Sequence, residues 1–158
     1  MRSLREIVIA EYRGRPARPD EIATYLGPEY KPGRAWCAGF VAWCLMSAGY
    51  EAPYAGPARR GARALVKWLA ADSGWLVAPG TRKPDLSVIR PGDVVCWRRV
   101  RIGWQCHVAV VIACDDKTIT VMGGNEGGRV RGRRLSRDKF CQHLRGLYGV
   151  VRPRMVKV

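Results

Sequence analysis

The sequence predicts an α+β domain in which N-terminal helices pack on a small antiparallel β-sheet. In the first half of the 158-residue chain, apolar residues recur at helical spacing, and after residue 75 they gather in short runs typical of strands. Helices that precede strands, without regular alternation of the two, indicate this fold class. Hydrophobic residues make up 47% of the chain, which is enough for one core, so we expect residues 1–158 to form a single domain.

Four stretches are predicted to be helical. They cover residues 2–13, 21–26, 35–49 and 59–72. Asp20 stands where the N-cap of the second helix is expected. The third stretch is apolar nearly all round, which is typical of a buried central helix.

Four strands and one more helix are expected in the second half. The strands cover residues 93–97, 107–113, 118–122 and 148–153. Asp115-Asp116 provides the turn of a hairpin between the second and the third of them. Residues 136–144 are predicted to form a short helix.

The charge of the chain is strongly positive. Lys and Arg number 28 against 13 Asp and Glu, which gives a formal net charge of +15. Such a chain is attracted to polyanions, among them nucleic acid, anionic lipid and an acidic cell envelope. No apolar run reaches the roughly 18–20 residues of a membrane span. Glu6 and Glu11 interrupt the apolar N-terminus, so we expect synthesis in the cytoplasm without a signal peptide.

The six cysteines are expected to be reduced thiols. Cys37 and Cys44 stand seven residues apart on one predicted helix, roughly 10 Å along its axis. That separation is too long for a disulfide. The chain has no CxxC pair, so we expect neither a structural zinc site nor a metal or other cofactor.

Cys37 is the candidate nucleophile. It follows a turn and opens the most apolar helix of the chain. A helix N-terminus carries partial positive charge and free N–H groups, which lower the pKa of a thiol and can hold an oxyanion. The alternative is an inert buried cysteine, a description that Cys44 fits.

A thiol nucleophile needs a base and a group that orients the base. His107 begins a predicted strand and can project into a cleft, whereas His143 lies on a basic helix that we expect at the surface. Asn125 is the candidate orienting residue, since strand alternation puts it on one face with Gly123 and puts Glu126 on the other. Glu126 stays open as an alternative orienting acid.

Two further groups are candidates for substrate binding. Trp36, beside the nucleophile, and Trp104, in the loop before the histidine, can line a groove, because tryptophan faces stack on sugars and peptide groups. In the basic stretch 127–139, three arginines are candidates for docking carboxylates or phosphates, namely Arg131, Arg133 and Arg134. The alternative for this stretch is a solvated loop.

Four motifs resemble those of CHAP-type amidases and peptidases, which belong with the NlpC-type, papain-like hydrolases. AWCAGFVAWCL at 35–45 resembles the nucleophile helix of that family. PGDVV at 91–95 resembles its turn into the first core strand, HVAVV at 107–111 its histidine strand, and MGGNE at 122–126 a variant of its third motif. The motifs occur in order and at the spacing of the family.

The resemblance implies a papain-like α+β fold and cleavage of an amide bond of bacterial peptidoglycan without a metal. It implies Cys37 as nucleophile, His107 as base and Asn125 as orienting residue. The activity would be that of an N-acetylmuramoyl-L-alanine amidase or of a peptidoglycan endopeptidase. Residues 35–126 would form the motif core, and the basic segment 127–158 would belong to the same catalytic domain.

The resemblance also implies the partners and the setting. The partners would be peptidoglycan and anionic envelope polymers, and we expect a monomer. The protein would act on the cell wall after release or delivery, as a phage endolysin, an injected effector or a virion-borne enzyme does. The alternative class is a small basic binding module for nucleic acid or the envelope, with structural Cys and His.

Overall fold

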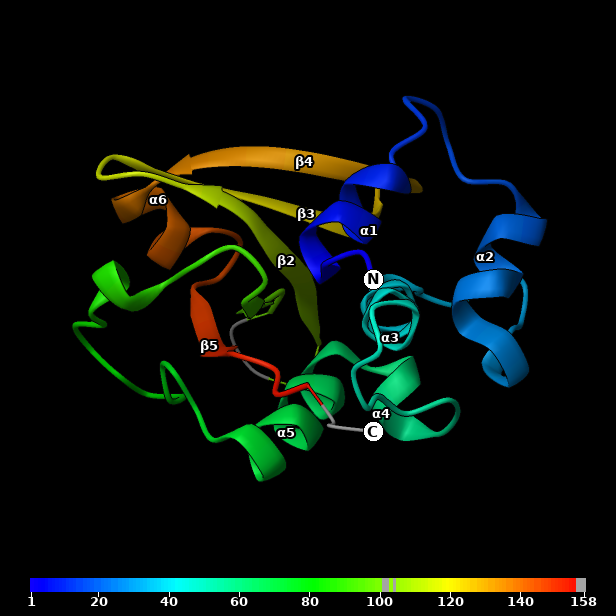
Figure 1. Cartoon of the computed structure of the whole chain (residues 1–158), viewed down its shortest axis with the longest axis horizontal. Coiled ribbons are helices and arrows are strands. Elements are labelled where there is room, and N and C mark those ends of the chain that lie inside the picture. Colours follow the sequence, from blue (N-terminus) through cyan, green and yellow to red (C-terminus); the bar gives the residue numbers. More distant parts are fainter. Residues whose placement is uncertain (101–102, 104, 156–158) are drawn as a thin grey trace.

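A computed structural model describes residues 1–100, 103 and 105–155 of the chain (Figure 1). Its helices are α1 (Leu4–Ala10), α2 (Pro19–Leu26), α3 (Cys37–Ser47), α4 (Pro57–Arg60), α5 (Ala62–Ser73) and α6 (Arg137–Gln142). Its strands are β1 (Val94–Arg98), β2 (Cys106–Cys114), β3 (Thr118–Glu126), β4 (Arg129–Ser136) and β5 (Leu147–Val151). Short 3-10 turns, η1 and η2, occupy Gly27–Glu29 and Leu86–Val88. The α+β class is therefore as the sequence predicts.

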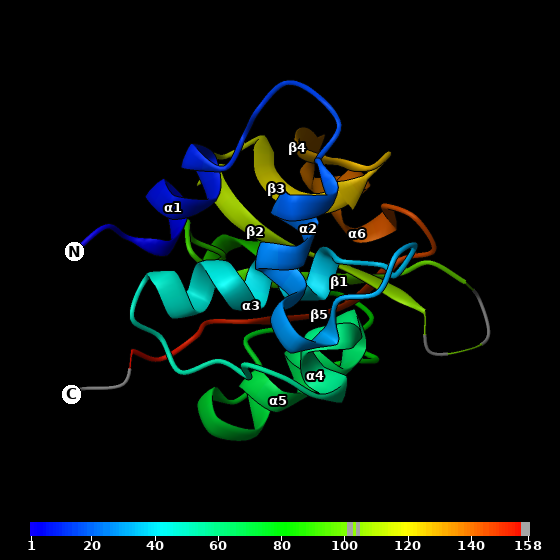
Figure 2. The same ribbon diagram turned by 90° about the vertical axis from the view of Figure 1, so that its right-hand side faces the viewer.

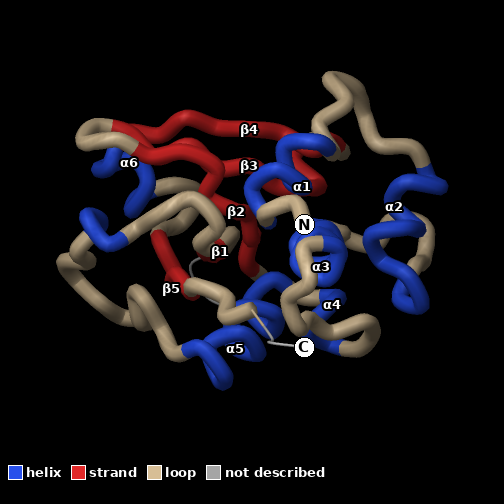
Figure 3. Tube along the Cα trace, in the orientation of Figure 1, coloured by secondary structure: helices blue, strands red, loops and turns tan. Residues whose placement is uncertain are grey.

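The five strands form one antiparallel sheet in the order β4-β3-β2-β1-β5. Figure 3 shows the strands gathered in one curved layer, with α1, α3, α4 and α5 to one side of it. Viewed from the side, α3 runs along the sheet, and α2 packs against α3 (Figure 2). The predicted hairpin between β2 and β3 is confirmed.

The central strands are apolar on both faces because both faces are covered. Val94 and Val108 pack among residues of α1, α2, α3 and α5. Val95 and Ala109, one residue along each strand, pack on the opposite face against Phe140 of α6 and the segment before β1. Alternate residues of a strand point to opposite faces, so burial of both faces requires continuous apolar runs such as those of β1 and β2.

Three local predictions differ from the structure. The helix expected over 59–72 is broken into α4 and α5, because Gly61 adopts an extended conformation between them. Asp20 is not an N-cap: α2 begins with Pro19 at its first position, and Arg18 is the cap residue. The basic stretch 127–139, for which a solvated loop was the alternative, contains the edge strand β4 and the first half of α6.

The sequence prediction missed β4, although a Gly-Gly pair forms the turn that leads into it. Gly127 and Gly128 connect β3 to β4 with φ angles of 61° and 73°. Positive φ at both central residues is the geometry of the tight hairpin turn that matches the twist of antiparallel strands. This pair was the sequence signal for a hairpin, and the run of arginines after it obscured the strand.

The six cysteines are free thiols. Among the described residues, no helix combines the length and the apolar character that crossing a bilayer requires.

Candidate active site

Cys37 is the first residue of α3 and lines a cavity of about 330 Å³. Ala35, Arg60, Gly61, Ala62, Arg99, Gln105, Cys106 and Asn125 line it as well. The residue is 5% exposed, and the backbone N–H of Val108 is close enough to lower the pKa of its thiol. Since Val108 follows His107 in β2, the candidate nucleophile lies against the backbone beside the candidate base.

The net pKa shift of Cys37 is opposite to the sequence expectation. Burial raises the pKa of the Cys37 thiol, and the N–H groups of Val108, Ala38 and Cys37 itself, together with Arg99, offset only part of that rise. The predicted effect of the helix N-terminus is present, but desolvation of the thiolate outweighs it. In this state the candidate nucleophile is a neutral thiol, which would need a base.

His107 is buried, with 1% of its surface exposed. Its ring stacks on Trp97 of β1, with the ring centroids 6.4 Å apart. Burial lowers the pKa of His107 to about 3, and the positive charge of Arg99, His143 and Arg133 adds to the effect. The imidazole is therefore neutral at physiological pH and able to accept a proton.

Arg99 assigns the roles of the ring nitrogens. Its Nη2 lies 3.2 Å from His107 Nδ1. A guanidinium can only donate, so Nδ1 is the acceptor and Nε2 carries the proton. Arg99, the donor to Nδ1, also lines the cavity of Cys37. No hydrogen bond joins Cys37 directly to His107 within residues 1–100, 103 and 105–155; a gap of this kind is common before substrate binds.

Glu126, not Asn125, approaches the histidine. The carboxylate Oε1 of Glu126 lies 3.5 Å from His107 Nε2 and 2.9 Å from Arg133 Nε. Nε2 has no closer hydrogen-bond partner in the described part of the chain. The side chain of Asn125 makes no hydrogen bond to the ring among these residues, and instead it lines the cavity of Cys37.

A β-bulge explains why the alternation argument is wrong. Between Gly123 and Glu126, β3 advances three residues while β4 advances two, from Arg131 to Arg129. Asn125 sits in the bulge with a φ of 57°. One extra residue moves every later side chain to the opposite face. Glu126 thus takes the face of Gly123, the face toward His107.

The two glycines before the bulge allow the strand to approach the site. A Cβ on Gly123 would lie 3.1 Å from His107 Nε2. A Cβ on Gly124 would lie 2.6 Å from the Trp36 ring and 2.8 Å from Phe40 Cβ, closer than side chains can pack. Glycine at 124 therefore lets β3 press against the start of α3.

The remaining predicted residues have mixed outcomes. Trp36 is 3% exposed and stacks on Tyr25 at 5.6 Å, so most of its surface belongs to the core, although it also lines a cavity of about 340 Å³. Trp104 lies outside the described residues. Of the arginines on β4, Arg133 is held by Glu126. His143, expected at the surface, is half-buried against Trp97 at 4.9 Å.

Sequence reasoning missed Arg99 and a group of cations beside the site. Arg99 touches His107 and lines the cavity of Cys37, but nothing in its sequence context marks it.

The described residues hold no group of three or more His, Cys, Asp or Glu side chains placed to bind a metal ion.

The fold and the site together have the arrangement of an amidase- or peptidase-type hydrolase domain: a helix that opens with a thiol, set against the strand that carries a histidine. The family model of the CHAP domain matches residues 29–125, more than half of the chain. The chain belongs to the CHAP domain family, whose members are peptidoglycan hydrolases of the amidase and peptidase type. No curated protein matches the sequence.

Proposed function

We propose that this CHAP domain hydrolyses an amide bond of peptidoglycan, with Cys37 as nucleophile, His107 as base and Glu126 as orienting acid. One observation carries the proposal: Cys37 lines a cavity, and the backbone N–H that favours its thiolate belongs to Val108, the residue that follows His107. The bond cleaved would be the lactyl–alanine amide or a peptide bond of the stem or cross-link, since the same chemistry serves both.

The reaction would begin with proton transfer. His107 Nδ1 takes the thiol proton once Arg99 moves away from it, and the thiolate sulfur attacks the amide carbonyl carbon. The carbonyl oxygen then carries the negative charge. The N–H groups at the start of α3 and that of Val108, which already point to the sulfur, are donors for this oxyanion.

The second half of the reaction would release both products. His107 returns its proton to the departing amine nitrogen, the C–N bond breaks and an acyl-enzyme remains on Cys37. Water, deprotonated by the same nitrogen, attacks the thioester and releases the carboxylic acid and the free thiol. Glu126 stabilises the imidazolium that forms twice in this cycle, because its carboxylate faces Nε2.

The proposal replaces Asn125 by Glu126 as the third catalytic group. A carboxylate 3.5 Å from Nε2 supports this role, and the lining position of Asn125 supports a contact between its amide and the substrate. On this proposal the protein acts on the cell wall after release or delivery. The binding-module alternative is less favoured, since cationic side chains line the cavity of the thiol and the cavity that adjoins it.

Digestion of purified sacculi followed by mass spectrometry tests the function. Wild-type protein should release fragments with one new amine and one new carboxylate at a single type of amide bond, in buffer that contains EDTA as well as without it. Cys37→Ala should release none. Fragments released equally by Cys37→Ala, or sacculi left intact by wild type, would contradict the proposal.

A further inference from the structure

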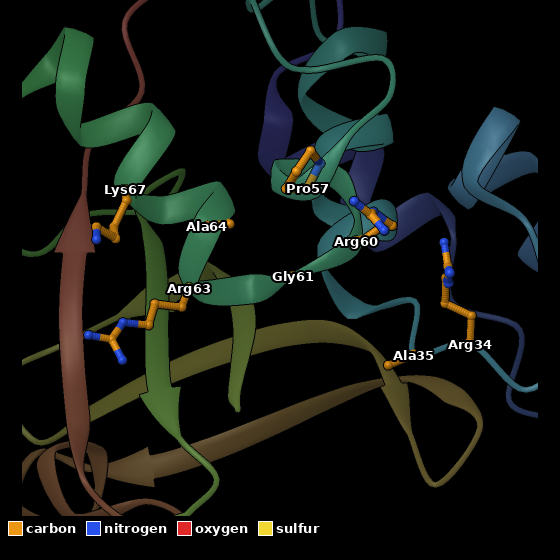
Figure 4. Close-up of a pocket in the computed structure, with 8 residues that line it drawn as sticks. All are labelled: Arg34, Ala35, Pro57, Arg60, Gly61, Arg63, Ala64 and Lys67. Carbon is orange, nitrogen blue, oxygen red and sulfur yellow. The ribbon is translucent and has the colours of Figure 1, made fainter. Parts of the chain in front are cut away.

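A second cavity, of about 550 Å³, opens beside the cavity of Cys37 (Figure 4). It lies between the loop before α3 and the helices α4 and α5. Ala35, Arg60 and Gly61 line both cavities, so the two adjoin. The second cavity is therefore within reach of a substrate that is held at Cys37.

Four cationic side chains line this second cavity, and together we call them the cationic subsite: Arg34, Arg60, Arg63 and Lys67. Figure 4 shows them as two pairs, Arg63 with Lys67 on α5 and Arg60 with Arg34 on the other side of Gly61. None of the lining residues that the structure describes is acidic. The nearest carboxylate in an ion pair with them is that of Glu29, 3.3 Å from Arg34 and 3.2 Å from Arg60. One carboxylate shared by two guanidinium groups leaves an excess of positive charge.

Contacts with neighbouring residues position three of these cations, Arg34, Arg60 and Arg63. Arg59 is fully buried and donates to the backbone oxygen of Tyr25, which anchors α4 and leaves its neighbour Arg60 facing the cavity. Glu29 also accepts a hydrogen bond of 2.8 Å from the Gly56 N–H, which fixes the position of its carboxylate. The Arg63 guanidinium lies 5.0 Å from the centre of the Tyr148 ring. Donors fixed before binding lose little conformational entropy when an anion arrives.

The ligand chemistry follows from the donors. Guanidinium groups pair with carboxylate or phosphate oxygens through charge-assisted hydrogen bonds. Arg34 stands three residues before Cys37, so their Cα atoms lie at most about 11 Å apart. An anion held by the Arg34 side chain therefore lies within a few residues of the scissile amide of an extended peptide.

We propose that the cationic subsite binds a free carboxylate of the peptide substrate and thereby selects which amide reaches Cys37. This proposal rests on the proposed hydrolase function. It makes the enzyme specific for stem peptides whose carboxylate, a few residues from the cut, is not amidated. The phosphate groups of wall polymers share the oxyanion chemistry, and the test separates the two sources.

The test uses synthetic soluble muropeptides that differ in one group. In each member of the set, one free carboxylate is converted to the neutral carboxamide. Wild-type protein should lose about 10- to 100-fold in kcat/KM on one member, the range expected when a hydrogen-bonded charge is removed. Equal rates on every member would overturn the proposal, while the cleavage itself would still support the hydrolase.

A double variant assigns the effect to the subsite. Arg60→Gln with Lys67→Gln should lower kcat/KM on the free-carboxylate substrate to the level of the carboxamide, with the larger change in KM. Arg82→Gln with Lys83→Gln removes the same charge from an exposed loop away from the subsite and should keep the full preference. A double variant in the subsite that keeps the preference would overturn the assignment. Failure of wild type to cleave any member would instead count against the hydrolase function.

Sacculi stripped of phosphate-containing polymers separate the two sources of anion. If the subsite binds the peptide carboxylate, the subsite variant should be impaired on stripped and unstripped sacculi alike. Impairment that disappears when the polymers are removed would show that the subsite binds wall phosphate, and would overturn the carboxylate proposal.

Discussion

The two walls of the cavity around Cys37 use their charges differently. The sheet wall, made of β2, β3 and β4 with Arg99, pairs its charged groups with one another: Arg99 lies on His107, and Glu126 lies between His107 and Arg133. The helical wall, made of α3, α4 and α5, presents Arg60 to this cavity and Lys67 to the adjoining one, and a single carboxylate, that of Glu29, pairs with Arg60. Paired and buried groups hold a geometry, whereas cations that face a cavity can bind a ligand.

Cations that are close in sequence need not act together, whereas cations that are distant in sequence can line one cavity. Arg131, Arg133 and Arg134 are neighbours on β4, yet Arg133 binds Glu126 and Arg134 contacts Thr118 and Asp115 at the opposite end of the sheet edge. Arg34 and Lys67, 33 positions apart in the sequence, meet at one cavity. A run of charge in the sequence is thus a poor guide to where charge accumulates.

Loss of Cys37 from the helical wall or of His107 from the sheet wall should have the largest effect on activity. Cys37→Ala and His107→Ala should each lower kcat/KM on a soluble muropeptide by roughly three to six orders of magnitude, because nucleophile and base act as one unit. Cys106→Ser is the matched control, since this thiol lines the same cavity. If Cys106→Ser were as inactive as Cys37→Ala, the choice of nucleophile would be wrong.

Loss of the orienting carboxylate of Glu126 should have the next largest effect on activity. Glu126→Gln should lower kcat by about ten- to a hundredfold with a smaller change in KM, because the imidazolium loses its charged partner and the ring its fixed position. Asn125→Ala should raise KM more than it lowers kcat. The reverse pattern for the two variants would return the orienting role to Asn125.

Burial of neutral His107 on the sheet wall should make folding stability depend on pH. Its pKa is about 3 in the folded protein and about 6.5 in the unfolded chain, so below pH 6.5 the unfolded chain binds a proton that the folded protein does not. Stability should therefore fall as the pH falls. Between pH 7 and pH 5 this group alone should cost about 2 kcal/mol of unfolding free energy.

Urea unfolding of wild type and His107→Gln at both pH values measures this contribution. The variant should lose about 2 kcal/mol less than wild type over the same interval, since the titrating group is gone and the carboxylates are unchanged. An identical loss in both proteins would mean that the ring is protonated in the folded state.

The smallest effect is expected from the exposed arginines of β4, Arg131 and Arg134. Arg131→Gln with Arg134→Gln should change kcat/KM on a soluble muropeptide by less than about threefold, and should weaken binding to intact sacculi at low salt only. Long-range attraction to an anionic wall is screened as the Debye length falls from about 10 Å at 0.1 M to about 3 Å at 1 M salt. Sacculus pull-down across a salt series gives the measurement, with Arg133→Gln as the contrasting variant that also disturbs Glu126. Tight, salt-independent binding by the double variant would show that β4 has no part in docking.

The sequence alone determined the features that depend on local pattern. Apolar spacing located the helices of the first half, and the all-round apolar stretch located the central helix that begins at Cys37. Short apolar runs located β1, β2 and β5, and the polar turn after β2 located the hairpin to β3. These features follow from the next few residues along the chain, because helix and strand periodicity are local properties.

Only the tertiary structure decided the chemistry at the centre of the site. Pairing of β3 with β4 introduced the bulge that turns Glu126, and not Asn125, toward His107. Packing of distant segments around Cys37 raised its pKa despite the helix N-terminus. Register, burial and the meeting of Arg34 with Lys67 all depend on which remote segments lie side by side, and the pattern of neighbouring residues does not contain that information.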